Sequence, residues 1–428
     1  MKRYKLSTKF FNQSQKVIPL GSQTFSKSII MLPKGISPLY TEKAKGPYIW
    51  DIDGNKYIDF CNALASVLLG YCNKEVNKVV QSQLDKGVTF SISHTAETQL
   101  AKKIIKMVPS AEMVRFGKNG TDATSAAIRI ARAYTKKKRI AVCGYHGWQD
   151  WYIGSTSRNL GVPNEVKNLT LKFSYNDFYS LEKIFKKYPN DIAAVILEPM
   201  NIEYPRDLFL EKIRKITQKK KSVLIFDETI TGFRFSKGGA QKLFGVYPDI
   251  TTLGKGLANG FPLSVICGKK EIMKLMNEIF YSGTFSGEAL SLHAALETLN
   301  QISKKNVLKK INNLGNFLID KLNQIIIKRK LKNIISISGH PSWTFLNIKG
   351  TNKCDKFLIK TFILQEFFKK GIFFIGTHNL SYAHESSHIK RLILVYDDIF
   401  SRLYEHLKKE NLLSKIKSEP IKPIFEIR

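Results

Sequence analysis

Residues 223–268 read VLIFDETITGFRFSKGGAQKLFGVYPDITTLGKGLANGFPLSVICG, and they decide the fold. The stretch opens on a short, β-prone apolar run at 223–226, which is typical of a buried strand and is followed by two acids, the first of them Asp227. A second strand-like run at 249–253 leads to Lys255, which stands between two glycines. Ligands of open α/β sheets lie beyond the carboxyl ends of the strands, so both side chains are expected at that edge.

These two residue types suggest a chemistry. A lysine whose amine is desolvated in a cleft loses its proton more easily and becomes a nucleophile. A carboxylate nearby can keep a pyridine nitrogen protonated, which is what a pyridoxal phosphate enzyme needs beside its Schiff-base lysine. Taken alone, Asp227 is equally typical of a helix N-cap, and Lys255 is one of many lysines that a basic chain exposes.

The whole string is more specific than its two reactive residues. FDETITGFR, GGAQ and FGVYPDITTLGKGLANGFPLSVICG together resemble the class III, fold type I, pyridoxal phosphate-dependent aminotransferases, and most of all the glutamate-1-semialdehyde 2,1-aminomutase subfamily. The resemblance extends from about residue 19 to about residue 384. It implies an α/β fold in which a large domain, with a mostly parallel sheet between helices, is joined to a small α+β domain.

The resemblance and the chain's patterns also suggest domain boundaries. Residues 1–70, with a hairpin pattern at 48–60, are expected to contribute to the small domain. Residues 71–310 are expected to form the large domain that binds the cofactor, and residues 311–428 the rest of the small domain. A long amphipathic pattern at 289–327 predicts one helix that leads into this last part.

Candidate phosphate ligands precede a helical pattern of small residues. Asn119, Gly120 and Thr121 stand where a helix start leaves backbone N–H groups available to an anion, although a capped helix start without a ligand has the same pattern. The resemblance implies that these three residues hold the cofactor phosphate, in place of the family's Ser-Gly-Thr. It also implies that Thr284, in the glycine-rich segment 281–287, reaches the phosphate of the neighbouring subunit's cofactor in a homodimer with shared active sites.

Further candidates follow predicted strands. Tyr145 and His146 come after one of them, and an aromatic ring at that position can stack on a planar ligand. The resemblance implies that Tyr145 covers the cofactor ring and that His146 and Glu198 lie near it. The family usually has a valine on the opposite ring face, where this chain has Thr229, whose hydroxyl needs a partner if it is buried.

Two segments that bind substrate in the aminomutases differ here. An N-terminal arginine of those enzymes corresponds to a segment that contains Lys27, which keeps a positive charge without the bidentate fork. The aminomutases carry a glutamate in the C-terminal segment, and residues 376–379 contain none, which leaves Asn379 as the substrate candidate. In addition, Glu288 and Ala289 replace the aminomutases' Asn-Pro.

These differences favour an aminotransferase that acts on a carbonyl acceptor, such as a sugar or another small molecule, with a small-molecule amino donor. Intramolecular amino transfer by a glutamate-1-semialdehyde aminomutase remains an alternative. An inactive binding protein on the same fold is a third possibility, against which the retention of Asp227 and Lys255 argues.

Composition limits the partners and the compartment. The formal net charge is +33, but the basic residues are spread along all 428 positions, so solvated lysines explain the charge and we expect no nucleic-acid partner. No apolar run is long enough for a membrane span, and the N-terminus lacks the apolar region of a secretory signal, so no membrane partner is expected. The five cysteines contain no CxxC, and we predict reduced thiols in a cytoplasmic protein.

A last motif raises the question of a metal. His384 and His388 are spaced to share one face of a helix and so could bind zinc together. No third ligand with a motif spacing accompanies them, and the start of a helix is the simpler interpretation. We therefore expect no metal site.

Overall fold

The computed structural model describes residues 2–422, which form two compact units. The large unit comprises residues 65–68 and 74–308, and the small unit comprises residues 2–64, 69–73 and 309–422. None of the helices in this part of the chain combines the length and the apolar character needed to cross a lipid bilayer.

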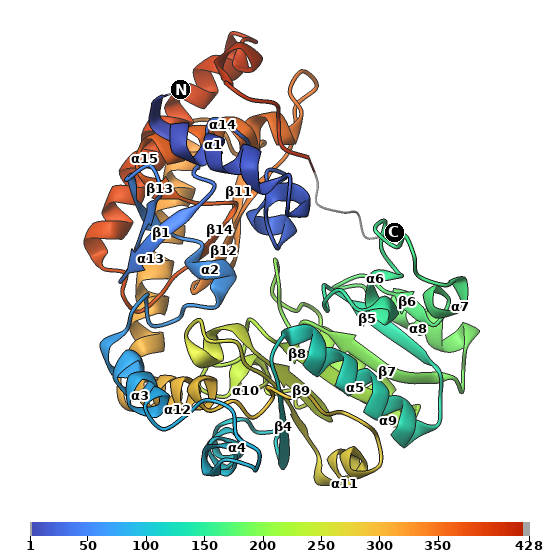
Figure 1. Cartoon of the computed structure of the whole chain (residues 1–428). Helices are drawn as coiled ribbons and strands as arrows, with labels where there is room; N and C mark the ends of the chain where they lie inside the picture. Colours follow the sequence, from blue (N-terminus) through green and yellow to red (C-terminus); the bar gives the residue numbers. More distant parts are fainter. Residues whose placement is uncertain (1, 423–428) are drawn as a thin grey trace. The chain divides into compact units, whose positions relative to one another are not determined.

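The large unit is built on a seven-stranded sheet (Figure 1). In spatial order its strands are β4 (Met113–Gly117), β10 (Ser264–Gly268), β9 (Ile250–Leu253), β8 (Val223–Glu228), β7 (Ile192–Leu197), β5 (Arg139–Cys143) and β6 (Thr170–Lys172). The ladders from β9 to β6 are parallel, and β10 is antiparallel to both of its neighbours. This confirms the predicted α/β class with a mostly parallel sheet.

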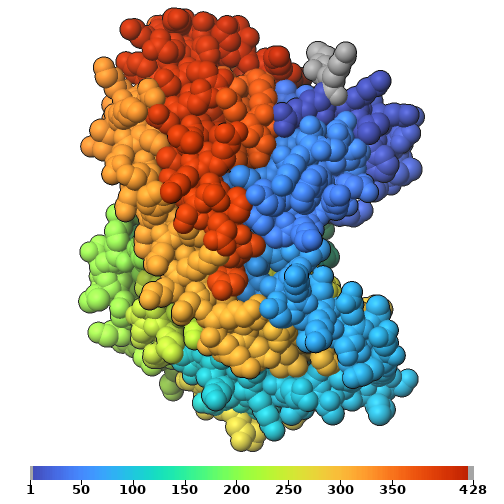
Figure 2. All heavy atoms as spheres, turned by 90° about the vertical axis from the view of Figure 1, so that its left-hand side faces the viewer, coloured from blue at the N-terminus to red at the C-terminus, as the bar shows by residue number. Residues whose placement is uncertain are grey.

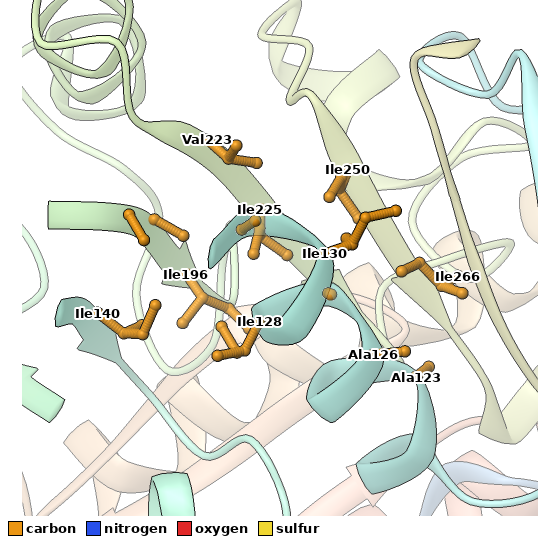
Figure 3. Close-up of a cluster of buried hydrophobic side chains, with 14 of the residues drawn as sticks. Ala123, Ala126, Ile128, Ile130, Ile140, Ile196, Val223, Ile225, Ile250 and Ile266 are labelled. Carbon is orange, nitrogen blue, oxygen red and sulfur yellow. The ribbon is translucent and has the colours of Figure 1, made fainter. Parts of the chain in front are cut away.

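Both faces of this sheet are buried because its strands are apolar almost throughout. Along β8, Val223 and Ile225 face one core cluster, while Leu224 and Phe226 face a second cluster on the other side. Figure 3 shows the first cluster, in which residues of α5 lie against side chains of β5 and β7–β10. The alternation is what a strand with two buried faces requires.

Helices cover the sheet and extend the unit. They are α3 (Lys74–Leu84), α4 (Thr95–Met107), α5 (Gly120–Thr135), α6 (Asp150–Ile153), α7 (Asn164–Lys167), α8 (Phe178–Lys187), α9 (Phe209–Lys219), α10 (Gly239–Phe244), α11 (Lys270–Met273) and α12 (Ala289–Lys304), with 3-10 turns η4 (Lys255–Ala258) and η5 (Lys274–Asn277). Residues of α5 contribute to the first cluster, and those of α8 and α9 to the second.

The small unit contains two sheets. One has the order β1 (Thr41–Lys45), β2 (Tyr48–Asp51), β3 (Lys56–Asp59), β13 (Ile372–Phe373), and the other has the order β11 (Ile335–His340), β12 (Trp343–Ile348), β14 (Thr377–Asn379). The helical elements that lie wholly or mostly in this unit are η1 (Lys2–Tyr4), α1 (Lys5–Ser14), η2 (Pro19–Gly21), η3 (Phe25–Lys27), α2 (Asn62–Ala65), α13 (Val307–Lys328), α14 (Lys356–Lys369), α15 (Ser386–Lys408) and η6 (Leu412–Lys415).

Distant parts of the sequence meet in the small unit. Strand β3 pairs in parallel with β13, more than 300 positions later, and the Tyr48 hydroxyl lies 2.8 Å from Nε2 of His388. Figure 2 shows the corresponding surface, where N-terminal residues in blue lie beside α15 in red. His384 precedes α15 and His388 lies in its first turn, so the two histidines mark a helix start.

The single helix predicted over 289–327 is wrong. The structure has two helices, α12 and α13 (Val307–Lys328), because Lys305 adopts an extended conformation with ψ 161° and ends the first one. The apolar periodicity continues across the break, so the sequence pattern alone gave no sign of it.

A first prediction concerns the core of the large unit. Ile225 is fully buried, so Ile225→Ala removes buried methyl groups, leaves a cavity and is expected to lower the free energy of unfolding by about 2–5 kcal/mol. Denaturant unfolding of the purified protein measures the change. Leu160→Ala, at a fully exposed side chain, is the control and is expected to change little. Equal effects of the two substitutions would contradict the assigned core.

Candidate active site

The carboxyl ends of the parallel strands bring the candidate residues to one edge of the large sheet. Asp227 lies near the end of β8, Glu198 directly follows β7, and Tyr145 and His146 follow β5. Lys255 comes two residues after β9, whose Thr252 is paired with Asp227 in the β8–β9 ladder. The register of the sheet therefore places the acid and the lysine on neighbouring strand ends.

Asp227 is a buried carboxylate that accepts four hydrogen bonds. Its Oδ1 accepts from the Thr229 backbone N–H at 3.1 Å, the Thr229 hydroxyl at 2.6 Å and the Thr252 hydroxyl at 3.0 Å. Its Oδ2 lies 2.9 Å from Nδ1 of His146. Burial alone would raise the pKa of this carboxyl, but the bonds from His146 and Thr229 outweigh it and hold the pKa below its ordinary value.

The ring of His146 is fixed on both sides. Its Nε2 lies 3.0 Å from the carbonyl oxygen of Cys143, which can only accept. Its Nδ1 faces the Asp227 carboxylate, which also accepts while ionised. Both ring nitrogens therefore face acceptor oxygens, and the buried ring is held against the ionised acid. Trp151 is stacked on the ring, with centroids 6.5 Å apart.

Glu198 is the second buried acid of this edge, and its environment shifts its pKa in the opposite direction from that of Asp227. Its Oε2 accepts from the backbone N–H of Tyr145 at 3.2 Å and from the Asn201 amide at 2.7 Å. Burial, and then the charge of Asp227, raise the pKa of Glu198 above its ordinary value. The environment of this edge thus lowers the pKa of one acid and raises that of the other.

Lys255 is half-buried and has a strained backbone. Its φ of 40° lies in the left-handed region, which costs a non-glycine residue about 1–2 kcal/mol. The preceding residue, Gly254, packs closely against Thr229, since a Cβ on Gly254 would lie 3.3 Å from the Thr229 methyl group. The backbone that leads to Lys255 is therefore in contact with the residue whose hydroxyl binds Asp227. Strain of this kind is frequent at active sites because the surrounding structure enforces it.

The start of α5 has the features of a phosphate site. Thr121 is buried, and within residues 2–422 its hydroxyl has no hydrogen-bond partner. The same hydroxyl lies in the space that a Cβ on Gly147 would fill. A Cβ on Gly120 would lie 3.2 Å from Thr229, and Asn119 is exposed as the N-cap of the helix. An unsatisfied buried hydroxyl at a helix N-terminus fits an anionic oxygen.

Two more candidates are exposed. The Tyr145 side chain is 49 % exposed, and its ring meets Tyr152 edge-on with centroids 5.6 Å apart. Thr284 is exposed in the segment 281–287, whose flanks are tied down, since Arg115 donates to the carbonyl of Tyr281 at 3.0 Å. Both positions leave the side chains accessible to a ligand or to another subunit.

An ion pair that the sequence did not reveal connects three of these segments. Lys118, directly before the candidate phosphate loop, forms a 2.8 Å ion pair with Glu288 at the start of α12. Its ammonium also donates to the carbonyl of Pro262, in the chain that follows Lys255, and to the Ser291 hydroxyl. Both partners of the pair are less than one-fifth exposed.

The candidates Lys27 and Asn379 belong to the small unit. Lys27 is exposed at the end of η3. Asn379 is buried, and its Nδ2 donates to the carbonyl of Cys61 at 2.8 Å, while its backbone oxygen accepts from the side chain of Asn62. Asn379 therefore has a structural role, and the substrate roles of Lys27 and Asn379 stay predictions.

The part of the chain that the structure describes contains no group of three or more His, Cys, Asp or Glu side chains suited to a metal ion. The two histidines considered above have other partners. Nδ1 of His384 accepts from Ser381 at 3.0 Å, and His388 contacts Tyr48.

Comparisons with known proteins identify the family. The model of the family described as Aminotransferase class-III matches residues 32–391. The chain belongs to the class-III aminotransferases. A curated member, glutamate-1-semialdehyde 2,1-aminomutase of Aquifex aeolicus, is 36 % identical over 360 residues, which cover 80 % of this chain and 84 % of the relative.

Solved structures of this class agree in fold. The internal aldimine form of the FumI protein of Sphingopyxis sp., which contains pyridoxal phosphate, superposes with a TM-score of 0.88 at 27 % identity, covering 98 % of this chain and 99 % of the other. An omega-transaminase of Sphaerobacter thermophilus has a TM-score of 0.84 at 25 % identity, with 93 % and 97 % covered. The predicted family and fold class are thereby confirmed.

Some residues of this class-III aminotransferase site escaped the sequence interpretation. Thr252 could have been found, since it stands opposite Asp227 once the parallel pairing of the two strands is assumed. The pair of Lys118 and Glu288 could not, because its partners are 170 positions apart. The departure at Thr229 now has a physical explanation, since its hydroxyl has the Asp227 carboxylate as its partner.

The pair of His146 and Asp227 predicts a pH-dependent stability. Asp227 has a depressed pKa, so its contribution to stability is present above the unfolded pKa and is lost only when the pH falls through the lower folded value. In the His146→Phe variant no imidazole offsets the burial of Asp227, so the pKa of the Asp227 carboxyl rises. We expect a loss of about 3–5 kcal/mol in the free energy of unfolding at neutral pH.

That loss is expected to shrink as the pH approaches about 4, because the variant then protonates its buried Asp227. Denaturant unfolding at a series of pH values measures it. His293→Phe is the matched control, since Nδ1 of His293 faces only a backbone carbonyl, that of Ala289. A loss that does not vary with pH in His146→Phe would contradict the ion pair.

The pair of Lys118 and Glu288 predicts an energetic coupling. A double-mutant cycle with Lys118→Met and Glu288→Gln is expected to give about 1–2 kcal/mol, above the value for exposed pairs because both side chains are mostly buried. The exposed pair of Lys305 and Glu75, 3.2 Å apart, is the control and is expected to give less than about 0.5 kcal/mol. Equal coupling energies in the two cycles would argue against a stabilising ion pair of Lys118 and Glu288.

Proposed function

We propose that this class-III aminotransferase is a cytoplasmic enzyme that uses pyridoxal phosphate to transfer an amino group from a small-molecule donor to a separate carbonyl acceptor. The observation that carries the proposal is Asp227, a buried carboxylate kept ionised by four hydrogen bonds on the strand next to the one that leads to Lys255. A buried negative charge of this kind, beside the strand end that leads to the lysine, suits a pyridinium nitrogen.

The residues of the carboxyl edge fit the cofactor's parts. Asn119, Gly120 and Thr121 would hold the phosphate, for which the unpartnered Thr121 hydroxyl and the start of α5 are suited. The exposed ring of Tyr145 would cover one face of the pyridine and Thr229 the other. These assignments rest on local geometry and on the family resemblance.

When bound, pyridoxal phosphate supplies an aldehyde for the amine of Lys255 and a ring that takes up negative charge from the substrate's Cα. Asp227 would hold the proton on the ring nitrogen, because its own pKa is depressed. His146 keeps Asp227 ionised and oriented. Glu198 lies beside that carboxylate and would hold Tyr145 in place through the backbone N–H of that residue. The amine of Lys255, once released, would carry the proton between the substrate's Cα and the neighbouring carbon.

A second candidate is the intramolecular amino transfer of glutamate-1-semialdehyde 2,1-aminomutase. Its support is the curated relatives of that name at 36–38 % identity. Against it, residues 376–379 lack the aminomutases' glutamate and Lys27 replaces their arginine. The first candidate is preferred on those two differences, and the acceptor is a keto or aldehyde group of a larger small molecule, for example a sugar.

We also propose that the enzyme works as a homodimer. The segment 281–287 is exposed at Thr284 and Phe285, and its last neighbour, Glu288, is fixed by Lys118. A fixed segment with exposed side chains is suited to contact a second copy, where Thr284 would reach the other subunit's cofactor phosphate. Sedimentation of the purified holoenzyme measures the state.

Lys255→Ala is the direct test. The variant is expected to lose the visible absorption band of the lysine-bound cofactor, because only a primary amine can form that bond. The rate of the half-reaction with an amino donor is expected to fall by at least about 100-fold, since an acid/base group of this kind contributes 10²–10⁴-fold. Lys270→Ala, at an exposed lysine of the same unit, is the control and should retain both signals.

The products decide between the candidate reactions. Glutamate-dependent formation of pyridoxamine phosphate, followed by amino transfer to a separate acceptor, supports the aminotransferase. Conversion of glutamate 1-semialdehyde to 5-aminolevulinate without any second amino donor supports the aminomutase. A protein that binds the cofactor normally and performs neither reaction would be the inactive binding protein, and both enzyme proposals would fail.

A further inference from the structure

Tyr152 of α6 is a fully buried side chain for which the proposed chemistry has no role, yet it contacts three consecutive residues of the candidate site. Its ring meets the Tyr145 ring edge-on, with centroids 5.6 Å apart. It meets the His146 ring in the same way, with centroids 5.4 Å apart. Its hydroxyl donates to the carbonyl oxygen of Gly144 at 2.8 Å. A single side chain thus touches both aromatic candidates and the residue that precedes them.

The peptide bond between Gly144 and Tyr145 is held at both of its polar groups. Its carbonyl oxygen accepts from the Tyr152 hydroxyl, and its N–H donates to Oε2 of Glu198 at 3.2 Å. Burial raises the pKa of Tyr152, so the hydroxyl keeps its proton and remains a donor. Since Tyr152 and Glu198 are both buried, a rotation of this peptide unit would leave polar groups unpaired away from water, which is costly. The backbone that carries the Tyr145 ring is therefore fixed.

A glycine at position 144 makes this arrangement possible. Its φ of +100° lies in the region that favours glycine. A Cβ on Gly144 would lie 2.6 Å from Oε2 of Glu198, closer than real Cβ atoms approach other atoms. Any side chain at this position would therefore push Glu198 away from the N–H of Tyr145.

Tyr152 is anchored outside the candidate site. It lies with its neighbour Trp151 in the first core cluster, together with residues of α5. The indole N–H of Trp151 donates to the Ser125 hydroxyl of α5 at 3.0 Å, and the Trp151 carbonyl accepts from the hydroxyl of Thr170 on β6. These contacts tie the short helix α6 to the helix whose start is the candidate phosphate site. The Tyr152 hydroxyl therefore has a rigid base from which to hold Gly144.

We propose that Tyr152 is a positioning residue, which sets the direction of the Tyr145 ring by holding the carbonyl of Gly144. Because the Tyr145 ring is half-exposed, fewer neighbours hold it than hold a core side chain, and the direction of its backbone matters correspondingly more. The inference rests on the proposed function, since Tyr145 matters to the reaction only if it covers the cofactor ring. Tyr152 acts through Tyr145 and takes no part in proton transfer.

Tyr152→Phe is the test, because it keeps both ring contacts and removes only the bond to Gly144. In the holoenzyme this variant is expected to alter the visible circular dichroism per bound cofactor, which depends on how the aromatic rings around an achiral chromophore are oriented. The rate of the half-reaction with an amino donor is expected to fall at least about 5-fold, since small misplacements at a reaction centre are costly. Tyr40→Phe is the matched control, because the Tyr40 hydroxyl also donates to a backbone carbonyl, that of Gly21 at 3.1 Å in the small unit, and both signals should stay unchanged.

A second measurement shows whether the effect passes through Tyr145. In a Tyr145→Ala background, Tyr152→Phe is expected to change neither the circular dichroism nor the rate any further, because the ring that it directs is gone. An unchanged band and rate in Tyr152→Phe, an equal change in Tyr40→Phe, or a full further effect in the Tyr145→Ala background would each overturn the positioning role. A parent protein that shows no visible band of bound cofactor would instead refute the proposed function, and this inference with it.

Discussion

The chemistry of the large unit depends on one buried ion pair, that of Asp227 and His146. A carboxyl group at this depth would ordinarily become neutral, because burial penalises the charged form. The His146 ring and the two threonine hydroxyls reverse that tendency and keep Asp227 ionised. Burial, and then the charge of Asp227, raise the pKa of the neighbouring Glu198. The pKa values of the two acids are therefore moved in opposite directions, which is how two carboxyl groups in one site can take different roles.

Strained backbone accompanies candidate site residues in both units. In the large unit Lys255 has a left-handed φ, and the fully buried sheet supplies a rigid frame to hold it. In the small unit Asn62, Ala63 and Leu64 form a left-handed turn with φ between 46° and 59°. Asp59 accepts the backbone N–H of Asn62 at 3.1 Å, and the side chain of Asn62 donates to the carbonyl of Asn379. Left-handed conformations cost about 1–2 kcal/mol per residue, and they persist because several contacts of this kind hold the backbone in place.

The sequence predicted the elements whose residues are locally consistent and missed those that depend on distant contacts. Strands β8 and β9 lie where the runs at 223–226 and 249–253 predicted them. The break between α12 and α13 was missed because periodicity continues through it. At the candidate site, Asp227 and Lys255 could be recognised from strand ends, and the structure places them on neighbouring strands. The ion pair of Lys118 and Glu288 could not be recognised, since no local pattern encodes a partner 170 residues away.

The structure also changes the weight of the sequence differences that bear on substrate choice. The replacement of Asn-Pro by Glu288 and Ala289 has a local physical cause, because Glu288 pairs with Lys118 and caps α12. A substitution explained by such a contact says little about the substrate. The missing glutamate at residues 376–379 is different, because His378 and Asn379 of this segment bond to uncharged groups, the hydroxyls of Thr344 and Tyr396 and the carbonyl of Cys61. No ion pair within the described residues takes the place of that glutamate, so this difference, unlike the first, still bears on the choice of substrate.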